Sequence, residues 1–201
     1  DAIDIGVYRG VYSYKLSELF NHIYSFEPNP LLYPYLKKNL SKIINNITLF
    51  NYALSNTDGS VNLKIPNRSS SIFKNNIEEL YKLGCATIHE PNNFDSYKAF
   101  RVKKKKLDKV ILKNKKIGFI KIDVEGHEME VIQGAEKLLK NNRPVLLVEI
   151  EERHSKKKII YTIKYINSLG YECFFVKNNI LTNIDNLTKV AVHFKLSLYQ
   201  K

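Results

Sequence analysis

The sequence has few cysteines, no long hydrophobic run and fewer acidic than basic residues. Of its 201 residues only Cys85 and Cys173 are cysteines, too few for a disulfide framework and at no zinc-ligand spacing. The longest hydrophobic runs, such as 145–148, are far shorter than the ~18 residues that a membrane-spanning helix needs. No secretory signal is visible. These absences predict a protein of a reducing compartment, the cytoplasm.

The positive charge is in clear excess, because 32 Lys and Arg residues against 20 Asp and Glu residues give a net charge of +12. Such a balance is typical of proteins that bind nucleic acids, anionic membranes or phosphorylated substrates. The excess is nearly all lysine, however, and it is scattered among abundant Asn and Ile residues. The codon usage of a low-GC genome also enriches Lys, Asn and Ile. The positive charge alone therefore does not indicate a polyanionic partner.

Apolar spacing predicts strands that alternate with helices. The predicted strands cover residues 2–5, 23–26, 47–54, 61–65, 117–122, 145–150, 173–176 and 190–196. The predicted helices cover residues 16–23, 32–43, 110–112, 131–139 and 159–166. This alternation is typical of an α/β fold with a mainly parallel sheet, and the last two strands are expected to pair antiparallel at one edge.

The pattern predicts a single domain over residues 1–201, interrupted by one irregular stretch. Residues 66–100 show no clear periodicity, and loops of such length are usually functional. We therefore expect a variable insertion there. The chain opens without Met and already inside a strand-like segment, so the natural N-terminus is expected to lie upstream.

The ends of the first two strands carry residues suited to a nucleoside. Ligands of parallel sheets bind beyond the carboxyl ends of the strands. After Asp4, the glycines Gly6 and Gly10 let the backbone approach a ligand closely, and a helix begins beside them. The second strand ends at Glu27, 23 residues beyond Asp4, a spacing at which an acid suits the hydroxyls of a ribose. The glycine turn alone is also typical of an ordinary tight turn. The glycine turn together with Glu27 at this spacing is more specific for a nucleoside site.

Charged residues also follow two later strands. Asp123, Glu125, His127 and Glu128 lie at a predicted strand-to-helix elbow. Acidic residues favour a helix start, which accounts for Glu128 but not for Asp123, because Asp123 closes an apolar strand. Glu149 likewise interrupts an apolar strand. These side chains are expected to point into a site or to be paired.

Together these stretches resemble the FkbM family of S-adenosylmethionine-dependent methyltransferases, over residues 4 to about 171. The stretches that carry the resemblance are Asp4-x-Gly6-x-x-x-Gly10, Phe26-Glu27-Pro28-Asn29-Pro30, Asn51-Tyr52-Ala53-Leu54-Ser55, Lys121-Ile122-Asp123-Val124-Glu125-Gly126-His127-Glu128, Arg143-Pro144 and Val148-Glu149. The sequence departs from the family at Val7-Tyr8, where the family often has Ala-Asn, and in residues 66–100.

The resemblance implies a class I methyltransferase fold, which is a Rossmann-like sandwich with a mainly parallel seven-stranded sheet, one antiparallel edge strand and the order 3-2-1-4-5-7-6. It also implies S-adenosyl-L-methionine as cofactor and a role for each matching residue. Asp4, Gly6 and Gly10 would contact the methionine and ribose part, and Glu27 would hold the ribose hydroxyls. Asn29 would lie near the adenosine, and Asn51, Ala53 and Leu54 would border the adenine. Asp123 would face the sulfonium and the acceptor.

The implied reaction moves a methyl group from a sulfonium to the oxygen of a hydroxyl on a sugar, glycan, glycolipid or secondary metabolite. A carboxylate or imidazole within hydrogen-bond reach would accept the hydroxyl proton. The candidates for this base are Asp123, Glu125, His127 and His154. A divalent metal held by Asp123, Glu125 and Glu149 is an open alternative.

Other classes of function are weighed against this one. Lysine runs at 103–106, 113, 115–116 and 156–158 favour a nucleic-acid methyltransferase. Against it, the sequence lacks the Asn/Asp-Pro-Pro-Tyr/Phe stretch typical of such enzymes, and its aromatic residues do not interleave with the lysines. A non-catalytic binding module stays open, whereas an NAD-dependent oxidoreductase would need a tighter glycine pattern. The acceptor, the oligomeric state and a fused or partner enzyme of glycan synthesis also stay open.

Overall fold

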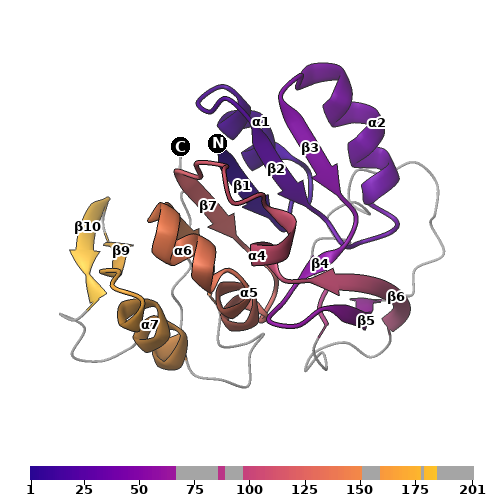
Figure 1. Ribbon diagram of the computed structural model, residues 1–201. Helices are drawn as coiled ribbons and strands as arrows, with labels where there is room; N and C mark the ends of the chain where they lie inside the picture. The colour runs from indigo at the N-terminus through magenta and orange to yellow at the C-terminus, as the bar shows by residue number, and fades with distance from the viewer. Residues whose placement is uncertain (67–85, 89–96, 151–158, 178, 185–201) are drawn as a thin grey trace.

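The central element of the fold is a five-stranded, entirely parallel sheet with the strand order β3-β2-β1-β7-β8 (Figure 1). The computed structural model describes residues 1–66, 86–88, 97–150, 159–177 and 179–184. The strands of this sheet are β1 (Ala2–Ile5), β2 (Ile23–Phe26), β3 (Ile47–Phe50), β7 (Phe119–Ile122) and β8 (Val145–Val148). The predicted α/β class with a mainly parallel sheet is confirmed.

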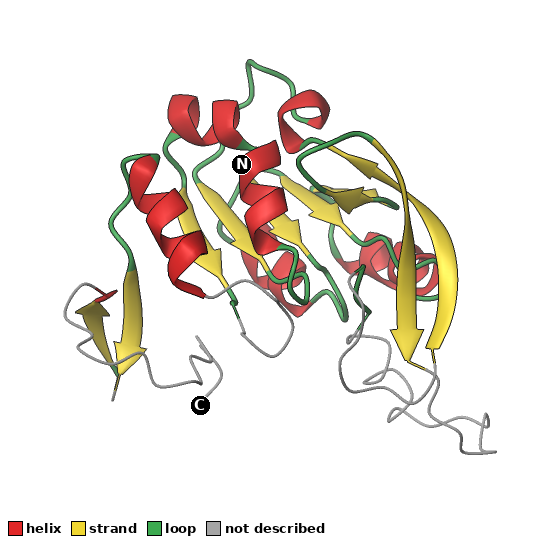
Figure 2. Ribbon diagram, turned by 90° about the horizontal axis from the view of Figure 1, so that it is seen from below, coloured by secondary structure: helices red, strands yellow, loops and turns green. Residues whose placement is uncertain are grey.

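Helices cover both faces of this sheet (Figure 2). Strand β1 is buried along its whole length, as a parallel sheet covered on both faces requires. Its side chains alternate between two cores: Ala2 packs with Leu16 of α1, whereas Ile3 and Ile5 pack with α5 and α6. The helices are α1 (Val11–Ser17), α2 (Tyr33–Ile43), α4 (Leu107–Val110), α5 (Glu128–Gly134), α6 (Glu136–Asn142) and α7 (Ile159–Ser168).

The single helix predicted over 131–139 is wrong, because the chain forms two helices there. Ala135 has φ −113° and ψ 7°, outside the helical range, and its N–H donates to the Ile132 carbonyl only three residues back. Gly134, which precedes the break, lies against the end of β4. A Cβ at this glycine would sit 2.1 Å from the Ser55 carbonyl oxygen.

The strand predicted over 47–54 is also divided. β3 ends at Phe50, and β4 (Ala53–Leu54) belongs to a second sheet with the order β4-β6-β5. The turn between them is held by the Asn51 side-chain amide, which donates to the Glu27 carbonyl at 2.9 Å. The chain therefore leaves the central sheet one residue past β3 and enters the neighbouring one.

A long hairpin-like pair forms most of the second sheet. β5 (Gly59–Pro66) and β6 (Tyr97–Lys105) pair antiparallel along eight residue positions from Gly59↔Lys104 to Pro66↔Tyr97. Strand β6 is not predicted from the sequence, because part of it belongs to the irregular stretch 66–100 and the rest to a lysine run. Of that stretch, the structure describes Pro66, 86–88 and 97–100, and the other residues lie outside the described part.

The C-terminal described strands do not join the central sheet. β9 (Phe174–Lys177) and β10 (Ile180–Asn183) pair antiparallel as a separate two-stranded sheet. The described residues thus give five central strands rather than the seven predicted, and the predicted partner strand at 190–196 lies outside them. No helix in the described part of the chain is long and apolar enough to span a bilayer.

Candidate active site

The site is built from the residues that follow the last paired position of each central strand. Ile5 pairs with Phe26 on one side and with Ile122 on the other, so the strands end level with one another. Backbone hydrogen bonds of 2.9–3.0 Å continue the ladder one residue further. In the order of the strands from β8 to β3, the residues at this edge are Glu149, Asp123, Gly6, Glu27 and Asn51. Sheet register alone therefore brings three distant acids to one edge.

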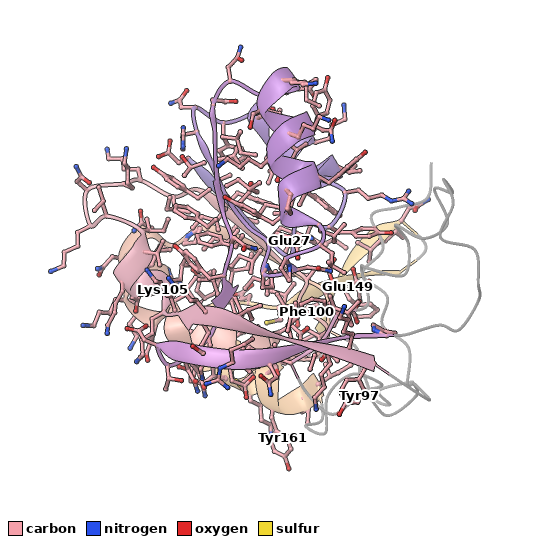
Figure 3. The ribbon with its side chains drawn as sticks, turned by 90° about the vertical axis from the view of Figure 1, so that its right-hand side faces the viewer. Glu27, Tyr97, Phe100, Lys105, Glu149 and Tyr161 are labelled. Carbon is pink, nitrogen blue, oxygen red and sulfur yellow. The ribbon has the colours of Figure 1, made fainter. Side chains whose placement is uncertain are left out.

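A cavity of about 290 Å³ opens at this edge. Four of its lining residues are acidic: Glu27, Asp123, Glu125 and Glu149. The others are mostly apolar or aromatic, and they come from the strand ends, from β4 and β5, and from the segment 86–88: Ile5, Gly6, Tyr8, Phe26, Pro28, Leu32, Tyr52, Ala53, Leu54, Leu63, Ala86, Ile88, Val124 and His127. Figure 3 shows Glu27 and Glu149 above the β5–β6 pair. The lining thus combines apolar side chains with four carboxyl groups.

Glu27 is the most constrained acid of the cavity. Its carboxylate accepts the Tyr8 N–H at 3.0 Å and the Asn29 N–H at 2.9 Å, and the residue is only 6% exposed. Burial raises the pKa of Glu27 to about 7, although the two N–H donors act to lower it. The side chain is therefore fixed in place and changes its charge close to neutral pH.

Lys121 is a buried cation beneath the site, and sequence reasoning did not identify it. Its ammonium donates to the Gly6 carbonyl at 2.7 Å and lies 3.2 Å from the Asp123 carboxylate and 3.6 Å from that of Asp4. Asp4 is fully buried and also accepts a 2.6 Å hydrogen bond from the Ser13 hydroxyl. Burial acts to lower the pKa of Lys121, but the two carboxylates outweigh it and raise that pKa. One ammonium thus joins the ends of β1 and β7.

The sheet register accounts for this pairing. Asp4 and Lys121 are directly opposite each other on β1 and β7, one residue before the strand ends. Their side chains therefore point to the same face of the sheet. The usable signal was a lysine inside the apolar strand Phe119–Ile122, which matches the aspartate inside Ala2–Ile5.

The two glycines of the first turn, Gly6 and Gly10, pack closely against different parts of the fold. A Cβ at Gly6, where φ is +81°, would lie 1.8 Å from the Asp123 carbonyl oxygen, so the end of β7 leaves no room for a side chain. A Cβ at Gly10, where φ is +80°, would lie 2.6 Å from Leu40 of α2. Gly6 lines the cavity and Gly10 does not. Packing against α2 and the left-handed backbone together account for Gly10 in this structure.

The elbow after β7 has an uncommon backbone. Glu125, at φ 51°, and Gly126, at φ 97°, both have left-handed conformations, which are strained for a residue with a side chain. The elbow is held from both sides: Gly126 N–H donates to the Glu128 carboxylate at 2.8 Å, and the Thr87 hydroxyl donates to the Glu125 carbonyl at 3.0 Å. Burial raises the pKa of Glu128 to about 7.

His127 faces the cavity but uses both ring nitrogens within the fold. Its Nε2 is 3.0 Å from the Ser55 hydroxyl and its Nδ1 is 3.4 Å from the Glu130 carboxylate. These contacts tie the start of α5 to the end of β4. Both ring nitrogens of His127 are thus engaged by side chains of the fold.

The structure brings many of the predicted site residues to the cavity, and the others lie behind it or outside the described part. Gly6, Glu27, Ala53, Leu54, Asp123, Glu125 and Glu149 line it. Asp4 and Asn29 are buried behind the wall, Asn51 holds the turn after β3, and His154 lies outside the described residues. Although Asp123, Glu125 and Glu149 share the cavity, the described residues form no group of three His, Cys, Asp or Glu side chains able to hold a metal ion.

Three comparisons relate the chain to known proteins. The model of the methyltransferase FkbM domain matches residues 4–173. The chain is 25% identical over 138 residues to a hexuronic acid methyltransferase, AglP, of Haloferax volcanii, a match that covers 69% of this chain and 51% of that protein. The crystal structure of methyltransferase FkbM from Methylobacillus flagellatus superposes with a TM-score of 0.57 at 16% identity, over 84% of this chain and 37% of that one. The chain thus spans about half the length of the curated relative.

Proposed function

The chain belongs to the FkbM family of methyltransferases, and from that premise we propose that it transfers a methyl group from S-adenosyl-L-methionine to a hydroxyl of a sugar-containing acceptor. This acceptor class comprises sugars, glycans, glycolipids and sugar-bearing secondary metabolites. The observation that carries the proposal is the cavity at the strand ends, which combines an apolar wall with four carboxylates.

The charge of the cavity fits a cationic cofactor. S-adenosylmethionine carries a positive sulfonium, which carboxylates within a few ångströms stabilise. Among the described lining residues there is no Lys or Arg side chain. A dinucleotide such as NAD would instead bring a pyrophosphate into the neighbourhood of the same carboxylates. The charge of the cavity therefore supports the methyltransferase hypothesis over the oxidoreductase one.

The residues at the cavity divide naturally into a nucleoside part and a reaction part. We infer that Glu27 accepts hydrogen bonds from the ribose hydroxyls, since its carboxylate is fixed by two backbone N–H groups and still lines the cavity. The apolar side chains of Phe26, Leu54 and Leu63 suit the adenine ring. When bound, the cofactor supplies an electrophilic methyl group.

On the reaction side, a carboxylate has to take the proton of the acceptor hydroxyl. Asp123 and Glu125 line the cavity, and Lys121 fixes the Asp123 carboxylate. A positioned base contributes about 10²–10⁴-fold to such a reaction. Whichever of the two accepts the proton, the other serves to orient the acceptor.

Variants at these two acids should separate the roles. Asp123→Asn and Glu125→Gln keep the size of each side chain, and we expect one of them to lower kcat by about 10²-fold or more while S-adenosylhomocysteine binds with little change. The measurement is transfer of a labelled methyl group to a panel of uronate and neutral glycosides. If both variants keep full activity, neither carboxylate is the base.

The sugar class of the acceptor is supported by the relative that methylates, by its name, a hexuronic acid. A uronic acid offers both hydroxyls and a carboxylate to a methyl donor. The carboxylates of Asp123, Glu125 and Glu149 would repel an acceptor carboxylate at the reaction point. Electrostatic repulsion therefore favours a neutral hydroxyl over a carboxylate as the acceptor group at this cavity.

The experiment that tests the cofactor is thermal unfolding with and without S-adenosylhomocysteine, with NAD as the control ligand. At 100 times its Kd a ligand stabilises the folded state by about 2.7 kcal/mol. For a chain of this size that raises Tm by roughly 5–10 °C. A well-folded sample that responds to neither ligand, or to NAD alone, would overturn the proposal.

A further inference from the structure

The β5–β6 pair has two different faces. Leu63, Ile65 and Val102 form a small apolar core on the inner face, and Leu63 from this face lines the cavity. The outer face of β6 carries Arg101, Lys103 and Lys105, which alternate with inner-face residues and are all exposed. We call these three residues the cationic row. Lys105 pairs with Leu54 of β4, which lines the cavity, so the row runs along the second sheet to the cavity wall.

Within the described part of the chain, no acidic neighbour neutralises the cationic row. Opposite Arg101 and Lys103 on β5 are Asn62 and Ser60, which carry no charge. None of the ion pairs among the described residues involves the row. Side chains two positions apart on a strand are about 7 Å apart, so three like charges lie within about 14 Å. Such a row costs stability by mutual repulsion and suits a ligand with several negative groups.

Protection of a sheet edge is a common structural reason for lysines on a strand, and it does not account for the whole row. Lysines often protect an exposed sheet edge from pairing with another chain. Among the described residues, β4 pairs with β6 only at Lys104 and Lys105, so Arg101 and Lys103 lie on an edge of the sheet and Lys105 does not. The row also reaches the cavity wall, because the Lys105 ammonium lies 5.0 Å from the centre of the Tyr52 ring, and Tyr52 lines the cavity. Figure 3 labels Lys105 on β6.

From these observations we propose that the cationic row binds an anionic acceptor, a sugar chain whose residues carry carboxylate or sulfate groups, and orients it over the cavity. The inference rests on the proposed function and names its substrate class. The cavity acids repel the negative groups of such a chain, whereas Arg101, Lys103 and Lys105 attract them. This separation of charge presents a neutral hydroxyl to the cavity and keeps the anionic groups on the hairpin.

The same row could attract a nucleic acid, but the face lacks a stacking platform. Binding of single strands uses successive aromatic side chains on which bases stack. On the described outer face of β6 the aromatic residue is Tyr97, eight positions from Lys105, whereas Phe100 points to the inner core. A sugar chain needs no such series of rings, so the observations favour the glycan.

The test compares two triple variants that lose the same charge. Arg101→Gln, Lys103→Gln and Lys105→Gln together remove the row, and Lys37→Gln, Lys38→Gln and Lys42→Gln together remove three exposed charges from α2. Binding is followed by fluorescence anisotropy, without cofactor, with labelled oligogalacturonide, a sulfated oligosaccharide, a neutral maltooligosaccharide and a single-stranded oligonucleotide of similar length. The carboxylate and sulfate probes identify the anionic group.

We expect the oligogalacturonide or the sulfated chain to bind and the neutral chain not to bind. The row variant should weaken that binding at least tenfold and flatten its salt dependence, and the α2 variant should stay within about twofold of the parent. Equal losses in both variants, equal binding of the neutral chain, or tighter binding of the oligonucleotide would each overturn the inference.

The outcome is separable from that of the proposed function. A chain that is stabilised by S-adenosylhomocysteine but binds neither anionic sugar contradicts the inference alone. A chain that binds the anionic sugar through the row but not the cofactor product contradicts the proposed function alone. Circular dichroism of both triple variants establishes that the comparison is between folded proteins.

Discussion

Lys121→Met is expected to lower the free energy of unfolding by about 3–5 kcal/mol, because it removes the ammonium from beside a buried carboxylate. Asp4 is fully buried and lies 3.6 Å from that ammonium. The substitution also leaves the Gly6 carbonyl without its 2.7 Å donor. For a chain of this size the loss corresponds to a fall in Tm of roughly 6–20 °C, measured by calorimetry.

A pH series adds a specific signature to this result. Burial already raises the pKa of Asp4, and without Lys121 that pKa rises further. The folded variant then binds a proton that the unfolded chain releases, so its deficit should be smaller at pH 5 than at pH 8. Asp4→Asn in the Lys121→Met background should restore part of the stability, because both charges are then gone.

The matched control is the exposed ion pair of Lys109 and Asp58. Their charged atoms are only 2.6 Å apart, but the side chains are 65% and 42% exposed. Surface pairs of this kind contribute about 0–1 kcal/mol, so Lys109→Met should melt within a few degrees of the parent. If the Tm of Lys121→Met falls as little as that of Lys109→Met, the buried cluster does not stabilise the strand ends.

Glu27→Gln is expected to raise the Kd for S-adenosylhomocysteine about tenfold to a hundredfold, because a hydrogen bond to a charged group contributes about 1.5–3 kcal/mol. The same experiment has a pH dependence. With the pKa of Glu27 near 7, only about one molecule in ten carries the carboxylate at pH 6. The ribose hydroxyls donate to the charged form, so binding by the parent should be about tenfold weaker at pH 6 than at pH 8, and binding by the variant should not vary.

Glu128→Gln serves as the control for this prediction. Burial raises the pKa of Glu128 to about 7 as well, but this side chain holds the elbow and does not line the cavity. In the unliganded protein both acids bind protons that the unfolded chain releases between about pH 4.5 and 7. The free energy of unfolding should therefore fall as the pH rises through that window, and each variant should remove part of this fall.

Only Glu27→Gln should also remove the pH dependence of ligand binding, measured by calorimetric titration. A Kd that stays constant between pH 6 and pH 8 in the parent would contradict the assignment of Glu27 to the ribose. A loss of that dependence in Glu128→Gln would move the assignment to the elbow instead.

The sequence predicts which acids lie at the strand ends of the candidate site. Asp123, Glu149 and Glu27 each follow an apolar strand, and the contrast between an apolar run and the acid that closes it marks all three positions. The roles of Asn51 and Gly10 cannot be predicted from the sequence alone. Both residues support neighbouring segments through contacts between residues far apart in the chain. Lys121 is not marked in the same way, because its significance depends on the register between β1 and β7.

The fold, too, is predictable where a local sequence pattern marks an element and not where distant contacts determine it. The helices and the parallel strands have clear apolar periods, whereas β6 has lysines on both faces and its alternation is hidden. The inward-facing residues Phe100 and Val102 are flanked on the same face by Lys98 and Lys104. Pairing with β5 determines this strand, and pairing over such a distance along the chain is not visible in a local window.

The level strand ends have a consequence for how proteins built in this way diversify. Glu27 and Asp123 follow strands separated only by β1, so two strand spacings of about 4.8 Å fix the span between the acid proposed for the ribose and the acid proposed for the reaction. Backbone hydrogen bonds between the strands maintain this distance, whatever the length of the connecting loops. Insertions beyond the sheet can therefore change the shape and charge of the acceptor platform while the distance needed for methyl transfer is preserved.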